Sequence, residues 1–541
     1  MPLDERAPVN EPVLSYGPGS PERAALRLEI ERQSRTPIVV PLRIGGEALT
    51  PGEPAVLRAP HCHRLELGRA FSADATQVRS AVDAALSARA GWSNTDLGTR
   101  TAIFRRAADL LSGPRRQRLN AATLLGQSKT PHQAEIDAAC ELADFLRFNA
   151  YFAERLAGES LISPPGVTNT FDLRPLDGFV YAVTPFNFTA IAGNLPSVPA
   201  LLGNTVIWKP SPHALLSAHH VYELLSDAGL PAGVINLVSG DAPSISAELL
   251  SHPDFAGLHF TGSTDVFDAL NGRIAGQLNR YRSYPRIVGE TGGKDFIVAH
   301  ESADVEALAV AVVRGGCEYQ GQKCSAASRV YVPRSLWGAL EAQLIALVSQ
   351  IRLGDPADFS NFMGAVISRP AFERITRYQR DAARDPACRI VSGGGSNDEH
   401  GFFVTPTLVE VTDPHHPLLS EEIFGPLVGL FVYADDRYSQ VLDLIDRSTP
   451  YALTGAVFAR DRAAVAEADQ RLRFAAGNFY VNDKPTGAVV GQQPFGGSRR
   501  SGTNDKAGSA FNLLRFVSPR VRKETLEPPR EFGYPFMLPD R

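Results

Sequence analysis

Short apolar segments alternate with helical segments from residue 177 to about residue 482, and this alternation limits the fold more than any other feature. The first cycle has a strand at 178–183, a helix at 195–202 and a strand at 205–208. Strands that alternate with helices pair in parallel, because each helix crosses back over the sheet to the start of the next strand. We therefore expect an α/β fold. Further strands are expected at 234–238, 257–260, 296–298 and 329–332, and further helices at 214–228, 243–251, 305–316 and 336–351.

The chain is 541 residues long, which is more than one hydrophobic core usually holds together. The alternation starts again with new members after Glu290, which predicts a domain boundary near residue 288 and a second α/β domain that ends near 482. Amphipathic helices within 73–157 belong to the first part. The two ends, 1–60 and 504–541, are rich in Pro, Gly or charge and are expected to be arms.

Composition narrows the classes of function. The net charge of −5 gives no electrostatic reason for binding nucleic acid or an anionic membrane. No apolar run reaches the roughly 18–20 residues of a membrane span. The five cysteines form no CxxC pair, and the first residues have no signal or transit character, so we expect a cytoplasmic protein in a reducing compartment. The His61-Cys62-His63 pattern has no second ligand pair nearby, so no metal site is expected.

Two glycine-flanked loops carry residues suited to covalent acyl chemistry. Cys324 lies in the sequence GQKC at 321–324, and Glu290 lies in GETGGK at 289–294. A nucleophilic thiol needs a base, and a thioester made from it needs an activated water to break it. Taken alone, Cys324 is also compatible with a small buried core residue.

Three further segments each follow an expected strand. Asn187 has a side-chain amide that can donate to an oxyanion, Lys209 can reach a ribose or phosphate, and Gly262-Ser263 begin a helix whose backbone N–H groups suit a pyrophosphate. Open α/β sheets bind ligands at the carboxyl ends of their strands, where all three lie. No GxGxxG follows a strand in this region, so the ordinary Rossmann fingerprint is absent.

These motifs, taken together and in this order, resemble those of the aldehyde dehydrogenase superfamily. The matching segments are PFN at 185–187, WKP at 208–210, FTGS at 260–263, GETGGK at 289–294, GQKC at 321–324, EEIFGP at 421–426 and PFGG at 494–497. Within the superfamily, the segments 319–329, 475–497, 501–508 and 10–23 are most similar to members that oxidise L-glutamate γ-semialdehyde to L-glutamate with NAD, the second step of proline catabolism.

The resemblance implies a fold and a domain plan. The fold is aldehyde dehydrogenase-like, with two doubly wound α/β domains plus an oligomerisation arm. The implied parts are a dinucleotide-binding domain at 61–288 with a flap at 163–177, a catalytic domain at 289–482, a return to the first domain with the substrate loop at 483–503, and the oligomerisation arm at 504–541. A homodimer or dimer-based oligomer is implied, with a proline dehydrogenase as a candidate partner.

The resemblance also implies roles for single residues. Cys324 attacks the aldehyde, Asn187 holds the oxyanion and Glu290 activates water. The residues implied to contact the dinucleotide are Thr184, Lys209, Gly262, Ser263 and Glu422. The residues implied to contact the substrate are Glu141, Phe188, Ser325, Gly487, Ala488 and Phe495.

One position departs from the pattern, and two other functions stay open. Many NAD-preferring relatives have a Glu three residues after the WKP lysine, where this chain has Pro212, so NAD is expected from the resemblance and this contact leaves NADP open. The alternatives are a dehydrogenase for another amino-acid-derived semialdehyde and a catalytically silent binding protein on the same fold. The intact Cys324, Glu290 and Asn187 argue against the silent protein.

Overall fold

The first of two large sheets carries its strands in the order β11-β10-β7-β8-β9-β2-β3. In the computed structural model, which describes residues 7–540, the five strands from β11 to β9 are parallel, and β2 and β3 are antiparallel additions. The strand bounds are β2 (Leu42–Ile44), β3 (Glu47–Leu49), β7 (Phe179–Thr184), β8 (Thr205–Pro210), β9 (Ile235–Leu237), β10 (Phe255–Thr261) and β11 (Arg286–Glu290).

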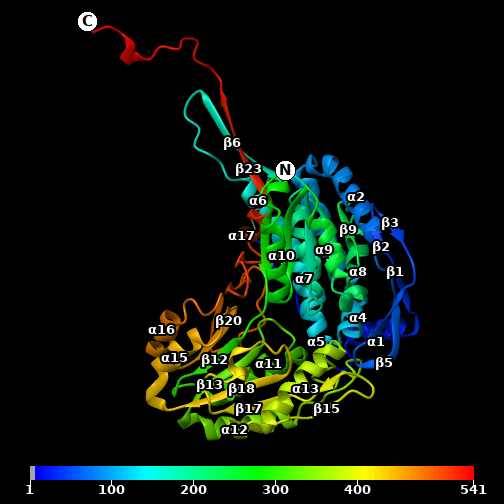
Figure 1. Cartoon of the computed structure of the whole chain (residues 1–541), viewed down its shortest axis with the longest axis vertical. Coiled ribbons are helices and arrows are strands. Elements are labelled where there is room, and N and C mark those ends of the chain that lie inside the picture. The colour runs from blue at the N-terminus through cyan, green and yellow to red at the C-terminus, as the bar shows by residue number, and fades with distance from the viewer. Residues whose placement is uncertain (1–6, 541) are drawn as a thin grey trace.

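The central strands β7 to β10 are buried on both faces, which is why they read as continuous apolar runs. Along β8, Val206 and Trp208 point into one hydrophobic core, and Ile207 points into the other. Helices cover both faces, as Figure 1 shows. They include α2 (Ala75–Ser93), α3 (Leu97–Ser112), α4 (Arg116–Gln127), α6 (Leu142–Ala157), α7 (Thr189–Leu201), α8 (Leu215–Asp227), α9 (Ala242–Leu250) and α10 (Thr264–Ala275).

The second large sheet forms the other domain, with the order β14-β17-β18-β13-β12-β20-β21. All of its pairs are parallel except β14 with β17. Its strands are β12 (Asp295–Ala299), β13 (Ala327–Pro333), β14 (Cys388–Ser392), β17 (Thr407–Val411), β18 (Leu427–Tyr433), β20 (Thr454–Phe458) and β21 (Asn478–Val481). Its larger helices are α11 (Val305–Cys317), α12 (Arg334–Ser349), α13 (Arg369–Arg384), α15 (Tyr438–Arg447) and α16 (Arg462–Arg471). The predicted α/β fold is confirmed.

The boundary between the domains lies slightly later than the predicted residue 288. Strand β11 continues through Glu290 and pairs with β10, because Thr261 and Glu290 are partners in the ladder. The second sheet then begins at Asp295. The change of domain therefore falls within 291–294, so Glu290 belongs to the first sheet and Cys324 to the second domain.

Both predicted arms are partly built into the first domain. Residues 1–60 were expected to form an arm, but β2 and β3 extend the first sheet, and α1 (Pro21–Arg35) packs against α4. In the tail at 504–541, Leu513 and Phe516 are buried in a core cluster of the first domain. The exposed part of the tail therefore begins only at about residue 518, because the preceding apolar side chains are needed by the core.

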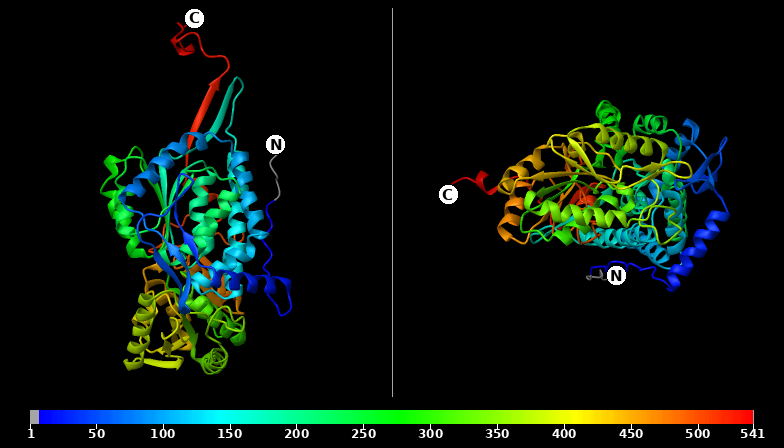
Figure 2. Two further views of the ribbon diagram at one scale, coloured as in Figure 1. Left: turned by 90° about the vertical axis from the view of Figure 1, so that its right-hand side faces the viewer. Right: turned by 90° about the horizontal axis from the view of Figure 1, so that it is seen from below.

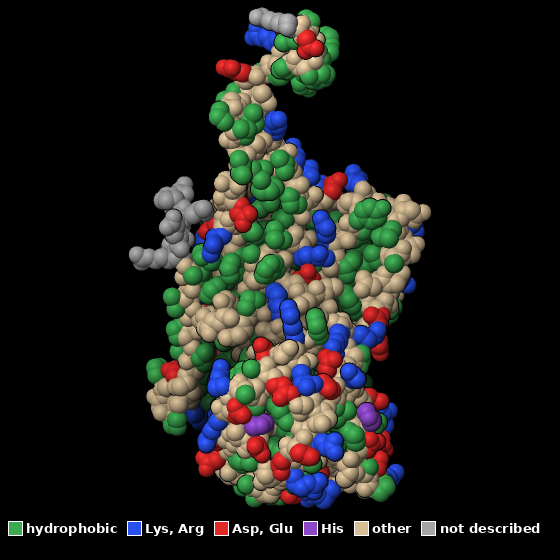
Figure 3. All heavy atoms as spheres, turned by 90° about the vertical axis from the view of Figure 1, so that its left-hand side faces the viewer, with side chains coloured by type: hydrophobic (Ala, Val, Ile, Leu, Met, Phe, Trp, Pro, Cys, Tyr) green, Lys and Arg blue, Asp and Glu red, His purple; other side chains and the backbone are tan. Residues whose placement is uncertain are grey.

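A two-stranded ribbon projects from the body of the molecule (Figures 1 and 2). Strand β6 (Val167–Pro175) pairs antiparallel with β23 (Val517–Thr525) over nine residues. Apolar side chains gather along the ribbon and on the face below it (Figure 3). Phe171, Val521 and Phe511 are among the exposed ones. Among residues 7–540, no helix has the length and apolar character that crossing a membrane requires.

The packing of Gly455 against Phe296 gives a test of the second core. The two residues are partners in the β12–β20 ladder, and a Cβ atom at position 455 would lie 2.1 Å from the ring of Phe296. We expect Gly455→Ala to lower the free energy of unfolding by about 1–3 kcal/mol, because the ring has to leave its packed position. Urea unfolding followed by fluorescence measures the change.

Gly338 provides the matched control. It lies in the exposed part of α12, and a Cβ there would meet nothing within 4 Å. Gly338→Ala should be neutral or stabilising by up to about 1 kcal/mol, because alanine is the better helix former. A Gly455→Ala protein as stable as the wild type would contradict the close packing.

Candidate active site

The carboxyl ends of four neighbouring strands bring the predicted residues to one edge of the first sheet. In the ladders, Val183 of β7 pairs with Lys209 of β8 and with Phe260 of β10, and Thr261 of β10 pairs with Glu290 of β11. Because parallel strands end at the same edge, Thr184, Lys209, Ser263 and Glu290 share it.

The loop before Cys324 is held in an unusual backbone conformation. After α11 ends at Cys317, Tyr319 and Gln320 both have positive φ angles, 50° and 55°. Such conformations cost about 1–3 kcal/mol each for non-glycine residues. The Gln320 side chain offsets this cost by donating to the carbonyls of Ser128 and Ala365 and accepting from the N–H of Gly364.

Cys324 and Glu290 lie in direct contact. The Cys324 thiol donates to Glu290 Oε1 at 3.3 Å, with Cys324 buried and Glu290 half-buried. Burial raises the pKa of the Glu290 carboxyl to about 7. Burial, followed by the nearby charge of Glu290, raises the pKa of the Cys324 thiol well above its usual value. Glu290 can therefore accept the thiol proton near neutral pH, and without such a base the thiol stays protonated.

A glycine permits the close approach of the two loops. A Cβ atom at Gly293 would lie 2.2 Å from the carbonyl oxygen of Cys324. Asn187 approaches the same loop from the first domain, where its Nδ2 donates to the carbonyl of Gln322 at 3.1 Å. The three predicted catalytic residues thus meet at the junction of the two domains.

A cavity of about 460 Å³ opens in front of Cys324. All six predicted substrate residues line it: Glu141, Phe188, Ser325, Gly487, Ala488 and Phe495. The Ser325 hydroxyl hydrogen-bonds to that of Thr486 at 2.8 Å. Sequence reasoning missed several lining residues, among them Asn10, His132, Lys323, Lys484 and Thr486. Lys323, Lys484 and Thr486 stand next to or close to predicted residues in the chain, and Asn10 opens the matching segment 10–23, so each had a usable signal.

A buried ion pair supports the wall of this cavity. Lys129 Nζ lies 2.7 Å from Asp137 Oδ2, and both side chains are almost fully buried. Asp137 accepts from the N–H groups of Thr189 and Ala190, the first two residues of α7. The Lys129 ammonium lies over the rings of Phe188 and Tyr319, at 4.3 and 4.4 Å from their centroids. One cation thus contacts both the Asn187 loop and the Cys324 loop.

The residues predicted to contact the dinucleotide include hydrogen-bonding groups at the sheet edge that have few partners within the protein. Lys209 is only 6 % exposed, and among the described residues its Nζ has a single hydrogen-bond contact, the carbonyl of Pro210 at 3.5 Å. A buried ammonium with so few partners fits an oxygen-rich ligand. Ser263 caps α10, and Gly262 donates to the carbonyl of Glu290. Thr184 accepts from the Trp208 indole.

Glu422 joins this edge from the second domain. Its Oε1 accepts from the N–H of Gly293 at 2.9 Å, and burial raises its pKa to about 6. Pro212 opens the short helix η2 (Pro212–Ala214) and offers no carboxylate. The geometry therefore places a hydrogen-bonded thiol–carboxylate pair between a polar strand edge and a cavity of mixed polarity.

Comparison with known proteins agrees with this geometry. Residues 53–520 match the model of the Aldehyde dehydrogenase family. The chain is 47% identical over 529 residues to mouse (Mus musculus) "Delta-1-pyrroline-5-carboxylate dehydrogenase, mitochondrial", covering 98% of this chain and 94% of that protein.

Solved structures give the same result. The Delta-pyrroline-5-carboxylate dehydrogenase from Mycobacterium tuberculosis bound with NAD superposes with a TM-score of 0.95 at 51% identity, covering 98% of both chains. Proline utilization A (PutA) from Bdellovibrio bacteriovorus superposes with a TM-score of 0.90 at 28% identity, covering 97% of this chain and 54% of that one. The chain belongs to the aldehyde dehydrogenase family.

Proposed function

We propose that this protein is an NAD-dependent dehydrogenase that oxidises L-glutamate γ-semialdehyde, the open form of Δ1-pyrroline-5-carboxylate, to L-glutamate in the second step of proline catabolism. The observation that carries the proposal is the Cys324–Glu290 contact at 3.3 Å, at the end of a cavity that is also lined by Ser325, Gly487 and Ala488. The relatives from mouse and M. tuberculosis bear the name of this activity over nearly the whole chain.

The reaction begins at the thiol. Glu290 accepts the proton of Cys324, and the thiolate forms a bond to the aldehyde carbon. The Asn187 amide and the Cys324 N–H then donate to the oxyanion, a type of contact worth about 3–4 kcal/mol for each donor. Bound NAD supplies the acceptor for the hydride that leaves this carbon. The carbonyl forms again as a thioester on Cys324.

The second half of the reaction releases the acid. Glu290 takes a proton from a water molecule, whose oxygen attacks the thioester carbon. The bond to sulfur breaks, the carboxylic acid departs, and Cys324 is regenerated. Glu290 lies close enough to Cys324 to serve both steps in turn, provided that it gives up its first proton before water is activated.

The NAD site in this proposal is the carboxyl edge of the first sheet. Thr184, Lys209, Gly262 and Ser263 would hold the dinucleotide from the first domain, and Glu422 would do so from the second. The undersatisfied Lys209 supports this assignment, as does the NAD named for the M. tuberculosis structure. Because Pro212 stands where a ribose-binding carboxylate is found in many relatives, the preference for NAD over NADP rests on other contacts.

The substrate site binds an α-amino acid head group. Ser325 Oγ and the N–H groups of Gly487 and Ala488 would donate to the carboxylate. Glu141 is half-buried, and its pKa is raised well above the usual value by desolvation and by the neighbouring Asp137. A substrate ammonium beside Glu141 would stabilise its ionised form. The rings of Phe188 and Phe495 would enclose the chain between the two ends.

The proposal extends to the domains and to assembly. We assign the dinucleotide-binding role to 61–290, the catalytic role to 291–482, and the substrate loop to 483–503. The ribbon of β6 and β23 would pair across a homodimer or a dimer-based oligomer, since its strand edges are open to another chain. A proline dehydrogenase is the proposed partner, because the matched part makes up only 54% of the PutA chain.

The proposed location is the cytoplasm. All five cysteines are unpaired, which fits a reducing compartment. The mouse relative carries "mitochondrial" in its name, so fractionation of the source cells with compartment markers decides between the two.

Substrate preference tests the function directly. We expect kcat/KM for L-glutamate γ-semialdehyde to exceed that for a plain aliphatic aldehyde of equal length by at least about tenfold, or roughly 1.4 kcal/mol, because only the former reaches the donors of the substrate loop. Ser325→Ala should narrow the gap mainly through KM. The rate of NADH formation measures both.

Two cysteine variants serve as controls for this assay. Cys324→Ala should form no NADH, whereas Cys317→Ala should keep most of the activity, because Cys317 is buried at the end of α11 and does not line the cavity. Equal kcat/KM for the two aldehydes in the wild type would reject glutamate semialdehyde. It would favour a dehydrogenase for another semialdehyde.

The pH dependence tests Glu290. Because the pKa of its carboxyl is raised to about 7, Glu290 is protonated at lower pH and gains its function as a base as the pH rises through 7. We expect the steady rate after the first turnover to rise about tenfold per pH unit below pH 7 and to level off above it. Glu290→Gln should lose this pH step and should slow both the burst of NADH and the steady rate, because the variant can deprotonate neither the thiol nor water. A burst as fast as that of the wild type would limit Glu290 to the activation of water.

Truncation tests assembly. Removal of 520–541 deletes most of β23, and we expect weaker self-association in sedimentation velocity, because β6 loses its partner strand. Removal of 528–541 is the control, because it leaves all nine ribbon pairs in place. The same sedimentation coefficient for both truncated proteins and the wild type would argue against the ribbon as an interface.

A further inference from the structure

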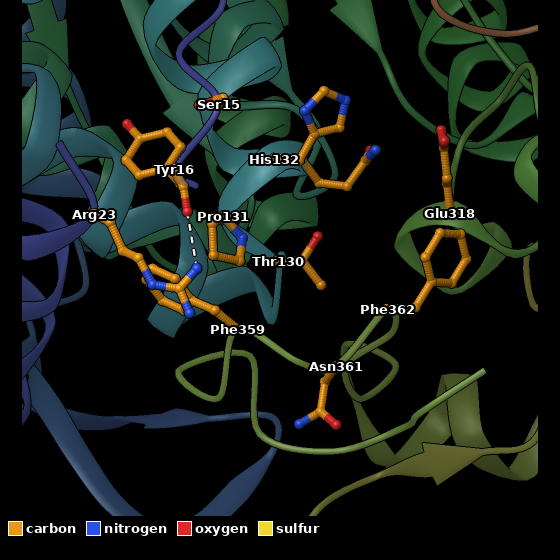
Figure 4. A pocket seen from close by; sticks show the side chains of 11 residues that line it. Ser15, Tyr16, Arg23, Thr130, Pro131, His132, Glu318, Phe359, Asn361 and Phe362 are labelled. Atoms are coloured by element: carbon orange, nitrogen blue, oxygen red, sulfur yellow. Dashed lines mark hydrogen bonds between the residues drawn. The ribbon is translucent and has the colours of Figure 1, made fainter. Parts of the chain in front are cut away.

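A second cavity, of about 200 Å³ (Figure 4), shares the lining residue His132 with the catalytic cavity. Its walls come from three distant parts of the chain. Tyr16 and Arg23 come from the N-terminal segment, residues 130–133 from the turn after α4 and the start of the next helix, and Glu318 and Phe359 from the second domain. The catalytic steps described above use none of these residues.

A buried ion pair separates the two cavities. Glu318 lines the second cavity, and Lys323 lines the catalytic one. Their charged groups lie 3.3 Å apart, and their side chains are 13% and 3% exposed. His132 lines both cavities. A change in the charge of Glu318 would therefore change the charge environment of Lys323, which is the neighbour of Cys324 in the chain.

Arg23 presents a fixed and unmatched positive charge to the second cavity. Its Nη1 donates to the carbonyl of Tyr16 at 2.9 Å, and its guanidinium lies over the Phe359 ring at 4.9 Å. Among residues 7–540, no carboxylate lies within ion-pairing distance of it. A guanidinium with one such bond retains N–H groups in the fork geometry that suits a carboxylate.

Unused hydrogen-bonding groups also face the second cavity. Gln133 lines it and is only 3% exposed, yet its side-chain amide makes no hydrogen bond to any described residue. The Thr130 hydroxyl has no such partner within the same part of the chain. Both groups are free to bond an occupant of the cavity, so this lining suits a polar ligand.

We propose that the second cavity binds a small α-amino acid as its zwitterion. Arg23 lies on one side of the cavity and Glu318 on the opposite side (Figure 4), which matches a carboxylate at one end and an ammonium at the other. Gln133 and Thr130 supply the remaining polar contacts, and the rings of Phe359 and Phe362 cover the aliphatic part. The binding itself does not depend on the proposed oxidation.

Equilibrium dialysis with radiolabelled L-glutamate tests the proposal. If the substrate assignment holds, wild-type protein should bind two molecules per chain, one in each cavity, and Arg23→Met should bind one. Arg27→Met is the matched control and should bind two, because Arg27 lies over the same Phe359 ring at 5.2 Å without lining the cavity. An Arg23→Met protein that binds as much L-glutamate as the wild type would overturn the proposal.

The two proposals fail in different ways. If the substrate assignment is wrong, the wild type binds no L-glutamate in the catalytic cavity, where binding depends on Ser325. It still binds one molecule in the second cavity, where binding depends on Arg23. Arg23→Lys keeps the positive charge but loses the paired N–H groups of the guanidinium. Its affinity for L-glutamate should therefore fall between those of the wild type and Arg23→Met. Each variant is shown to be folded if its urea unfolding midpoint equals that of the wild type.

Glutarate tests the chemical class, because it keeps both carboxylates of L-glutamate and lacks the ammonium. Its Arg23-dependent affinity should be at least about tenfold weaker than that of L-glutamate in the wild type, which corresponds to about 1.4 kcal/mol. Glu318→Gln should remove this difference. Glutarate that binds as tightly as L-glutamate in the wild type would make the cavity a plain anion site and reject the amino-acid assignment.

Discussion

The buried ion pair of Lys129 and Asp137 is the contact on which the catalytic arrangement depends. Asp137 fixes the first turn of α7, and with it the Asn187 loop. Lys129 contacts Phe188 on one side and Tyr319 on the other, so a first-domain cation fixes the second-domain loop that ends at Cys324. Removing one partner of such a pair typically costs about 3–5 kcal/mol, because the other charge is left buried and unpaired.

The strained loop before Cys324 is held by contacts from both domains. Two successive residues with positive φ are held by bonds from Gln320 to Ser128 and Ala365, which come from different domains. The position of the thiol therefore depends on the two domains staying in register. The proton partner of the thiol, Glu290, ends a strand of the first sheet, so the pair of reacting groups itself crosses the domain junction.

The sequence predicted the alternation of strands and helices well, because strands buried on both faces read as apolar runs with clear ends. It also predicted the residues that meet at Cys324, since Glu290, Asn187 and Ser325 stand in motifs with distinctive glycines. The sequence did not predict which side chains are buried where their burial depends on residues far away in the chain. The expected arm at 504–541 contains Leu513 and Phe516, whose burial is decided by packing against helices more than 300 residues earlier. Lys129 likewise stands outside the matching segments, and only the fold brings it to the site.

The ion pair of Lys323 and Glu318 has a chemical consequence for a site that handles aldehydes. An unprotonated lysine amine next to an aldehyde condenses with it to an imine and traps the substrate. Burial lowers the pKa of Lys323, which favours that reactive form, and the Glu318 carboxylate offsets part of this shift. The carboxylate thereby favours the protonated, non-nucleophilic amine. In the same cavity, Lys323 then competes less with the thiol of Cys324 for the aldehyde carbon.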